Sequence, residues 1–92
     1  MANVRVPAML RPTVGGERSV VADGSTLREL IFNVDQRHPG FAGQLLESNS
    51  GLQRPFVNIY LNDEDVRYLK GLETAVAEGD VISILPAVAG GA

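Results

Sequence analysis

The chain has 92 residues, of which 45% are hydrophobic and 21% are charged, and its formal net charge is -3. These values are ordinary for a single globular domain, and the scattered Lys and Arg residues argue against nucleic acid or an anionic membrane as the main partner. The chain contains no cysteine, which excludes disulfides, thiolate nucleophiles and cysteine-ligated metal sites within it. Because there is no apolar run of roughly 20 residues and no secretory signal pattern, we expect a cytoplasmic protein.

The start of the chain predicts a β-hairpin. Residues 3–10 alternate in part and predict a first strand, in which Pro7 indicates an edge position or a bulge. The loop at 11–17 contains Gly15-Gly16, which can adopt positive φ without strain. Residues 18–22 predict the returning strand.

A helix is predicted after this hairpin. Ser25 or Thr26 is suited to the N-cap position, and Glu29 is well placed as its capping-box partner. The helix is expected to end near His38, because the following proline disfavours helical geometry in the residue before it. One apolar stripe at helical spacing predicts the buried face: Leu27, Leu30, Ile31 and Val34.

The second half of the chain predicts short elements and a buried final strand. Helical turns are expected at 41–47 and 72–76, and strands at 56–62, 66–68 and 81–86. In the last strand Ile82 and Ile84 should face the helix, and its near-continuous apolar content favours a central position, parallel to the first strand. The order predicts an α+β β-grasp fold, with a mixed sheet of four to five strands wrapped around one main helix. We expect a β-grasp domain at 1–86 and a flexible tail at 87–92.

Two polar features favour structural roles. Asp63-Glu64-Asp65 is expected to form a solvated turn, since successive strand residues point to opposite faces and cannot converge on a metal or a substrate. His38 is the only histidine and cannot form a metal site alone. We therefore predict no metal site and no acid/base pair at these residues.

The outer face of the sheet and the tail are the candidate functional regions. Phe56, Tyr60 and Leu85 are predicted to share that face, either as ordinary exposed side chains or as a partner-docking patch. No charged residue follows Asp80, and Gly90-Gly91 lies shortly beyond the core strand. A small, neutral tail is suited to entering a narrow site, although a disordered end would have the same composition.

Several stretches together resemble a known family. They are Leu10-Arg11-Pro12 with Gly15-Gly16, Arg54 with the run from Phe56 to Tyr60, the run from Asn62 to Arg67, and the run from Leu85 to Gly91. On these residues the chain resembles the small ubiquitin-like β-grasp sulfur carriers of the ThiS/MoaD family along its whole length. Within the family it is most similar to the carriers of cysteine biosynthesis in actinobacteria.

The resemblance implies a specific role for the tail. A partner of the ubiquitin-activating (E1-like) class would use ATP to adenylate the carboxylate of Gly91, and a sulfur donor would then produce a thiocarboxylate. The carrier itself would bind no cofactor and would not be an enzyme. Ala92 departs from the family pattern, because it places Gly91 in a peptide bond. We expect a zinc-dependent peptidase, as in related carriers, to remove Ala92 before activation.

The acceptor of the sulfur stays open at this point. Resemblance favours cysteine formation on a pyridoxal-phosphate (PLP)-dependent synthase, and thiamine, molybdopterin or a secondary metabolite are alternatives. A ubiquitin-like modifier conjugated to lysines through Gly91 would share the same activation step. A non-catalytic β-grasp binding module with an inert tail is the remaining alternative.

Overall fold

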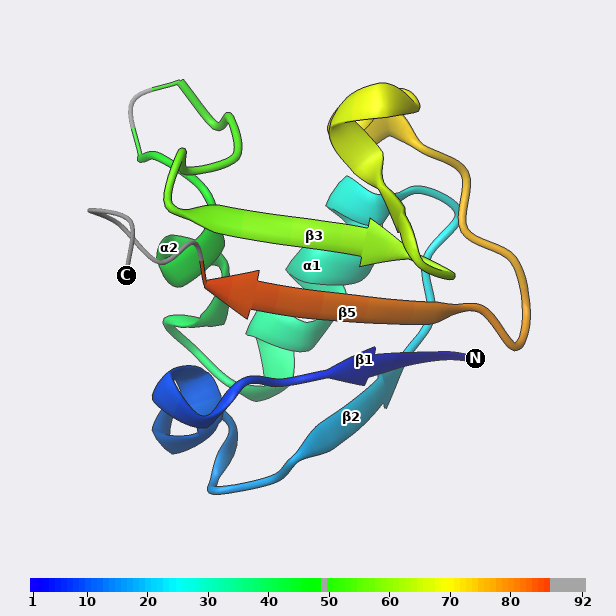
Figure 1. Cartoon of the computed structure of the whole chain (residues 1–92). Helices are drawn as coiled ribbons and strands as arrows, with labels where there is room; N and C mark the ends of the chain where they lie inside the picture. The colour runs from blue at the N-terminus through cyan, green and yellow to red at the C-terminus, as the bar shows by residue number, and fades with distance from the viewer. Residues whose placement is uncertain (49, 87–92) are drawn as a thin grey trace.

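The residues that the structure describes form one five-stranded mixed sheet with the longest helix packed across one face (Figure 1). This computed structural model describes residues 1–48 and 50–86. The strand order is β2-β1-β5-β3-β4, with β5 in the centre, parallel to β1 and antiparallel to β3. The strands are β1 (Ala2–Arg5), β2 (Ser19–Ala22), β3 (Val57–Leu61), β4 (Glu64–Asp65) and β5 (Val81–Pro86). The predicted β-grasp fold is confirmed, whereas the predicted tail at 87–92 lies outside the described residues.

The main helix, α1 (Leu27–Arg37), begins and ends as its sequence predicts. The Thr26 side chain accepts a hydrogen bond from the Glu29 N–H at 3.2 Å, so Thr26 is the N-cap. The Glu29 carboxylate accepts from the Ser25 N–H at 3.1 Å, one residue further back than in the usual capping box. His38 is the C-cap residue. The predicted apolar stripe is buried in full: Leu27, Leu30, Ile31 and Val34.

The core lies between α1 and the sheet. Ile82 and Ile84 of β5 and Ile59 of β3 face α1 and are buried. The short helix α2 (Phe41–Leu45), predicted at 41–47, closes one end of this core with the buried side chains of its first and last residues. The chain also approaches α1 closely at Gly24, where an added Cβ would lie 2.6 Å from the backbone nitrogen of Leu30. Only glycine fits this approach without a shift in the backbone.

The predicted first strand is wrong beyond Arg5. β1 ends there, and the chain continues as a 3-10 helix, η1 (Ala8–Val14), where the sequence predicted further strand and a loop. Pro7 has no N–H to donate to a ladder, and Leu10 and Val14, four residues apart, both turn into the core. The edge-or-bulge reading of Pro7 is wrong too, since β1 pairs on both sides and Pro7 lies beyond it.

The predicted strand at 66–68 is also wrong. β3 and β4 pair through a two-residue turn, in which Asn62 and Asp63 have φ of 47° and 75°. Asp65 then accepts from the Arg67 N–H at 2.9 Å and caps a 3-10 helix, η2 (Val66–Tyr68). The helical turn predicted at 72–76 is shorter and begins earlier, as η3 (Gly71–Glu73).

Arginine side chains bond to the backbone along both outer parts of the sheet. Arg37 donates to the carbonyl of Val21 in the edge strand β2. At the other side β4 is too short to cover all of β3, and Arg67 and Gln53 donate to the uncovered carbonyl of Val57 at 2.7 and 2.6 Å. Within residues 1–48 and 50–86, no helix has the length and apolar character needed to cross a bilayer.

Candidate functional site

The start of β5 is fixed by a dense set of hydrogen bonds. The Asn62 side chain donates to the Asp80 carboxylate at 2.9 Å and accepts from the Val81 N–H at 2.9 Å. The other carboxylate oxygen of Asp80 accepts from the Ala77 N–H at 2.8 Å. These bonds, that from Ala77 first and that from Asn62 second, hold the pKa of Asp80 below its ordinary value of 3.8. The strand therefore begins at a well-defined position.

The end of β5 carries the chain toward the predicted tail. Leu85 and Pro86 pair with Asn58 and Val57 of β3, and Pro86 is the last described residue. Gly90, Gly91 and Ala92 all lie outside the described residues. The six residues from 87 to 92 could extend by at most about 22 Å from Pro86. The predicted acyl group of Gly91 is therefore attached, by a short connection, to the central strand of the sheet.

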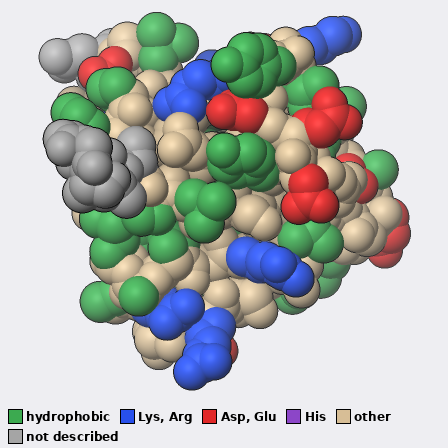
Figure 2. All heavy atoms as spheres, viewed as in Figure 1, with side chains coloured by type: hydrophobic (Ala, Val, Ile, Leu, Met, Phe, Trp, Pro, Cys, Tyr) green, Lys and Arg blue, Asp and Glu red, His purple; other side chains and the backbone are tan. Residues whose placement is uncertain are grey.

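A groove crosses the outer face of the sheet, on the side away from α1. It has a volume of about 470 Å³, and both Tyr60 of β3 and Leu85 of β5 line it. Leu85 is 50% exposed, whereas its neighbour Ile84 is 3% exposed. Figure 2 shows hydrophobic side chains over the centre of this face, basic side chains both toward β1 and β2 and along the opposite edge, and acidic ones mainly on the side where β5 begins. The structure therefore brings two of the three predicted docking residues together.

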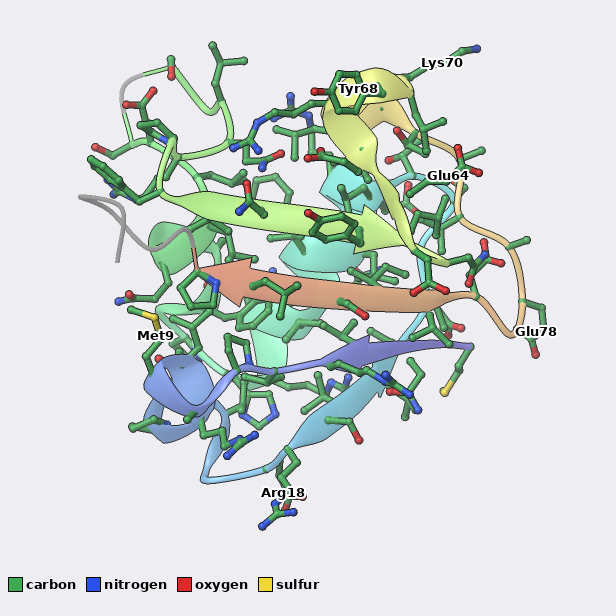
Figure 3. The ribbon with its side chains drawn as sticks, viewed as in Figure 1. Met9, Arg18, Glu64, Tyr68, Lys70 and Glu78 are labelled. Carbon is green, nitrogen blue, oxygen red and sulfur yellow. The ribbon has the colours of Figure 1, made fainter. Side chains whose placement is uncertain are left out.

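Phe56, the third predicted docking residue, lies in a different cleft. It precedes β3 and is 66% exposed. Its cleft, of about 160 Å³, is lined mainly by apolar side chains that include Met9 and Pro86. Figure 3 shows Met9 beside the end of β5. The groove and the cleft thus meet where β5 ends, and the role of all three residues in docking stays a prediction.

Sequence reasoning missed Arg5, Arg11 and Met9 at this surface. Arg5 and Arg11 line the groove, and Met9 lines the cleft and is 67% exposed. The alternation of β1 places Arg5 on the outer face, and this was readable from the sequence. Arg11 and Met9 were not, because they belong to η1, which replaced a predicted strand and loop.

The predicted acidic turn divides between the groove and the local structure. Asp63 lines the groove, whereas Glu64 is exposed and Asp65 caps η2. The His38 N–H donates to the Val34 carbonyl at 2.9 Å and so closes α1. Across residues 1–48 and 50–86, no group of three or more His, Cys, Asp or Glu residues is placed to hold a metal ion.

Sequence comparison places the chain in a family. The sequence pattern of the ThiS family matches residues 4–91. The sulfur carrier protein CysO of Mycobacterium tuberculosis is 49% identical over 89 residues, which cover 96% of this chain and 96% of that protein. The small archaeal modifier protein 3 of Haloferax volcanii is 36% identical over 81 residues, 85% of this chain and 86% of that protein.

Solved structures agree with the sequence relatives. The crystal structure of M. tuberculosis CysO superposes with a TM-score of 0.92 at 46% identity, and the match covers 96% of this chain and 100% of that chain. A chain of the BexX/CysO complex of Amycolatopsis orientalis superposes with a TM-score of 0.91 at 46% identity, covering 98% of this chain and 99% of that chain. The protein therefore belongs to the ThiS family and is a CysO-like β-grasp sulfur carrier, not a catalyst.

Proposed function

We propose that this chain carries sulfur as a thiocarboxylate on the carbonyl carbon of Gly91. The observation that carries the proposal is the position of the Gly-Gly tail. The tail follows the central strand of a ThiS-family fold, and that strand is fixed at its start and flanked at its end by exposed apolar side chains. The folded domain supplies the surface that partner enzymes bind, and a partner, not the domain, activates the reactive end.

The activation proceeds in two steps on an E1-like partner. A carboxylate oxygen of Gly91 attacks the α-phosphorus of ATP, and pyrophosphate leaves. The sulfur of the donor then attacks the Gly91 carbonyl carbon, and AMP leaves; with hydrosulfide as donor, the product is the thiocarboxylate. A carboxylate alone is a poor electrophile, so the adenylate supplies the leaving group. The partner binds ATP, and this chain needs no cofactor of its own.

Glycine is suited to this end of the chain because it has no Cβ. Backbone atoms of Gly90 and Gly91 can approach a nucleotide in a narrow channel where a side chain would collide. Ala92 introduces a methyl group and moves a terminal carboxylate by about 3.3–3.6 Å in an extended tail. Such an error is costly for a reaction that requires close alignment of the reacting atoms.

We therefore propose that the bond between Gly91 and Ala92 is hydrolysed before activation. A water oxygen bonds to the Gly91 carbonyl carbon, the peptide C–N bond breaks, and the Gly91 carboxylate becomes available. A zinc-dependent peptidase is suited to this step, since zinc polarises the carbonyl and lowers the pKa of bound water. The zinc would belong to that peptidase.

The similarity to CysO supports cysteine as the end product. The thiocarboxylate sulfur would bond to the β-carbon of an activated serine on a PLP-dependent synthase as the activating group leaves, and hydrolysis would then separate cysteine from the Gly91 carbonyl. The complex of a CysO with BexX supports the docking of this chain on a partner protein. The 36% identity to small archaeal modifier protein 3 favours conjugation to lysines as the alternative function, with the same activation. Incubation of the activated chain with lysine-rich proteins would separate the two, since only a modifier forms stable adducts of higher mass.

Mass spectrometry tests the proposal directly. A variant that ends at Gly91, incubated with its E1-like enzyme, ATP and sulfide, should gain the mass difference between sulfur and oxygen. The chain that ends at Ala92 should react only after the peptidase is added and one alanine residue is lost. Sulfur on Ala92, with the longer mass retained, would contradict the cleavage step. A variant that ends at Ala89 is the control: a carrier loses all acyl chemistry in this variant, whereas a binding module with an inert tail keeps its affinity for its partner.

A further inference from the structure

We infer that Arg5 and Arg11 select the partner that docks on the outer face of the sheet, and that this partner presents carboxylates beside an apolar side chain. The inference rests on the proposed function, because the partner meant is the E1-like enzyme that receives the tail. Tyr60 and Leu85 supply the apolar floor of the groove, and the two arginines add a charge requirement that apolar contacts alone would not impose.

Both arginines are held beside the apolar floor of the groove. Arg5 stands on β1 directly opposite Ser83 of β5 and is exposed. Arg11 extends from η1, and its Nε donates to the Val6 carbonyl at 3.2 Å. That bond orients the guanidinium and uses one of its five N–H groups, so others can bind a carboxylate in a bidentate manner.

Arg5 and Arg11 differ from the two arginines that form ion pairs. Arg28 and Arg67 form ion pairs with Glu73 at 2.8 Å and with Asp65 at 3.7 Å. By contrast, no carboxylate of residues 1–48 or 50–86 lies within ion-pair distance of Arg5 or Arg11. In a chain whose net charge is -3, this leaves a local positive charge next to exposed apolar surface. A complementary surface would therefore be acidic.

The charge of the groove also changes from one end to the other, and this change would set the direction in which a partner docks. Asp63 lines the groove near the start of β5, and it shares an adjoining hollow with Val81 and Arg5, whereas Arg11 does not line that hollow. Figure 3 shows Glu64 and Glu78 on that same side of the molecule, and Met9 of η1 at the opposite end of β5. Carboxylates of a partner would be repelled near Asp63 and attracted near Arg11, close to where the tail begins. Docking in this direction brings the acidic part of the partner toward the tail.

A charge-reversal experiment tests the inference. We compare the wild-type groove with R5E/R11E, both in chains that end at Gly91, by measuring pyrophosphate release by the E1-like enzyme used for the mass-spectrometric test. Complementary charges steer encounter and are screened by salt. We expect kcat/KM of R5E/R11E to fall by about 10- to 100-fold at low ionic strength. The wild-type kcat/KM should decrease as salt increases, and that of R5E/R11E should not.

Two controls separate the groove from net charge. R18E makes the same charge change on an exposed arginine outside the groove, which projects from the lower edge of the sheet in Figure 3, and it should leave kcat/KM within about twofold. D63N removes a negative charge inside the groove and should raise kcat/KM slightly. Asn also tolerates the positive φ of this position. If R5E/R11E does not fold, as judged by circular dichroism, R5Q/R11Q replaces it, with a smaller decrease expected.

The outcomes are distinct. If R5E/R11E keeps the wild-type kcat/KM and its salt dependence while the thiocarboxylate still forms, the inference fails and the proposed function stands. If the wild-type Gly91-terminated chain is never adenylated, both fail. Sedimentation of the same variants tests the rival occupant, a second copy of this chain. If the wild-type chain is a dimer and R5E/R11E is a monomer with the same kcat/KM, the groove serves self-association instead.

Discussion

The two ends of β5 are built in opposite ways. At the start, Asn62 and the Ala77 N–H hold Asp80, the Val81 N–H bonds to Asn62, and the Gly79 N–H donates to the Met1 carbonyl at 3.1 Å. At the end, Leu85 is 50% exposed, and Pro86 has no N–H to donate. One end of the strand therefore fixes its position, and the other presents apolar surface next to the tail.

Within the six residues of β5, one set of side chains therefore serves the stability of the fold and another is available for function. Side chains of β5 that face α1 stabilise the fold, whereas those that face outward contribute little to the free energy of unfolding. A carrier that passes between partners needs both properties, because its reactive end must move from one protein to another while the domain stays folded. Mutations along β5 can test this separation.

Removing core contacts near the anchored end should have the largest effect on stability. Ile82 is 1% exposed and packs against α1, so Ile82→Ala is expected to lower the free energy of unfolding by about 2–5 kcal/mol. Urea unfolding followed by circular dichroism measures this loss. Val81→Ala, on the partly exposed opposite face, is the matched control and should cost much less. Equal losses in the two variants would contradict the assignment of faces.

Removing the Asn62 side chain should loosen the anchored end itself. Asn62→Ala deletes the bonds to Asp80 and Val81 and places alanine at a φ of 47°, with an expected loss of about 1–3 kcal/mol in the free energy of unfolding. Asn62→Gly removes the same bonds but tolerates this φ. The difference between the two variants in urea unfolding therefore isolates the backbone contribution. A wild-type stability in Asn62→Gly would mean that the bonds contribute nothing.

Mutation at the exposed end of β5 is expected to change adenylation more than stability. Leu85→Ala should lower kcat/KM for adenylation by about tenfold, because a buried apolar anchor usually dominates a protein interface. Its free energy of unfolding should change by less than about 1 kcal/mol, since Leu85 is half-exposed in the free chain. Val21→Ala, at a similarly exposed side chain of β2, is the control for both measurements. The docking prediction fails if the two variants are activated equally well.

The smallest expected effect is a pH dependence at the anchored end. The pKa of Asp80 is lowered in the folded chain, so its contribution to stability is complete above its ordinary value of 3.8. That contribution is lost as the pH falls below 3.8 and through the lower folded pKa. Thermal unfolding of the wild-type chain and of Asp80→Asn across this range should show a shallower acid dependence in the variant. Parallel curves would show that Asp80 does not contribute.

The sequence predicted the parts of the fold that depend on periodicity. The apolar stripe of α1, the cap at Thr26 and the alternating faces of β5 follow from local spacing, and each is confirmed. The central position of β5 followed from its apolar content and is also confirmed. These features are set by residues a few positions apart, so they can be read without knowing the tertiary structure.

The errors occur where burial or a side-chain cap overrides a weak strand pattern. The residues after Pro7 alternate weakly, but they form a 3-10 helix in which Leu10 and Val14 are buried. The strand predicted at 66–68 fails for a local reason, because the Asp65 side chain caps the turn that becomes η2. The same limit applies to the candidate site. The pattern placed Phe56 on a strand face, whereas the structure places it before β3, beside Met9 of η1, in its own cleft.

The arginines along the sheet edges have a consequence for the protein at high concentration. An uncovered strand edge is a template on which another chain can add a strand, and such pairing leads to swapped dimers or fibrils. Arg37 occupies the Val21 carbonyl of β2, and Arg67 with Gln53 occupies the Val57 carbonyl of β3. An incoming strand would have to displace these donors and lie against their positive charges. The sheet is thus protected against aggregation at its edges, while its outer face stays open.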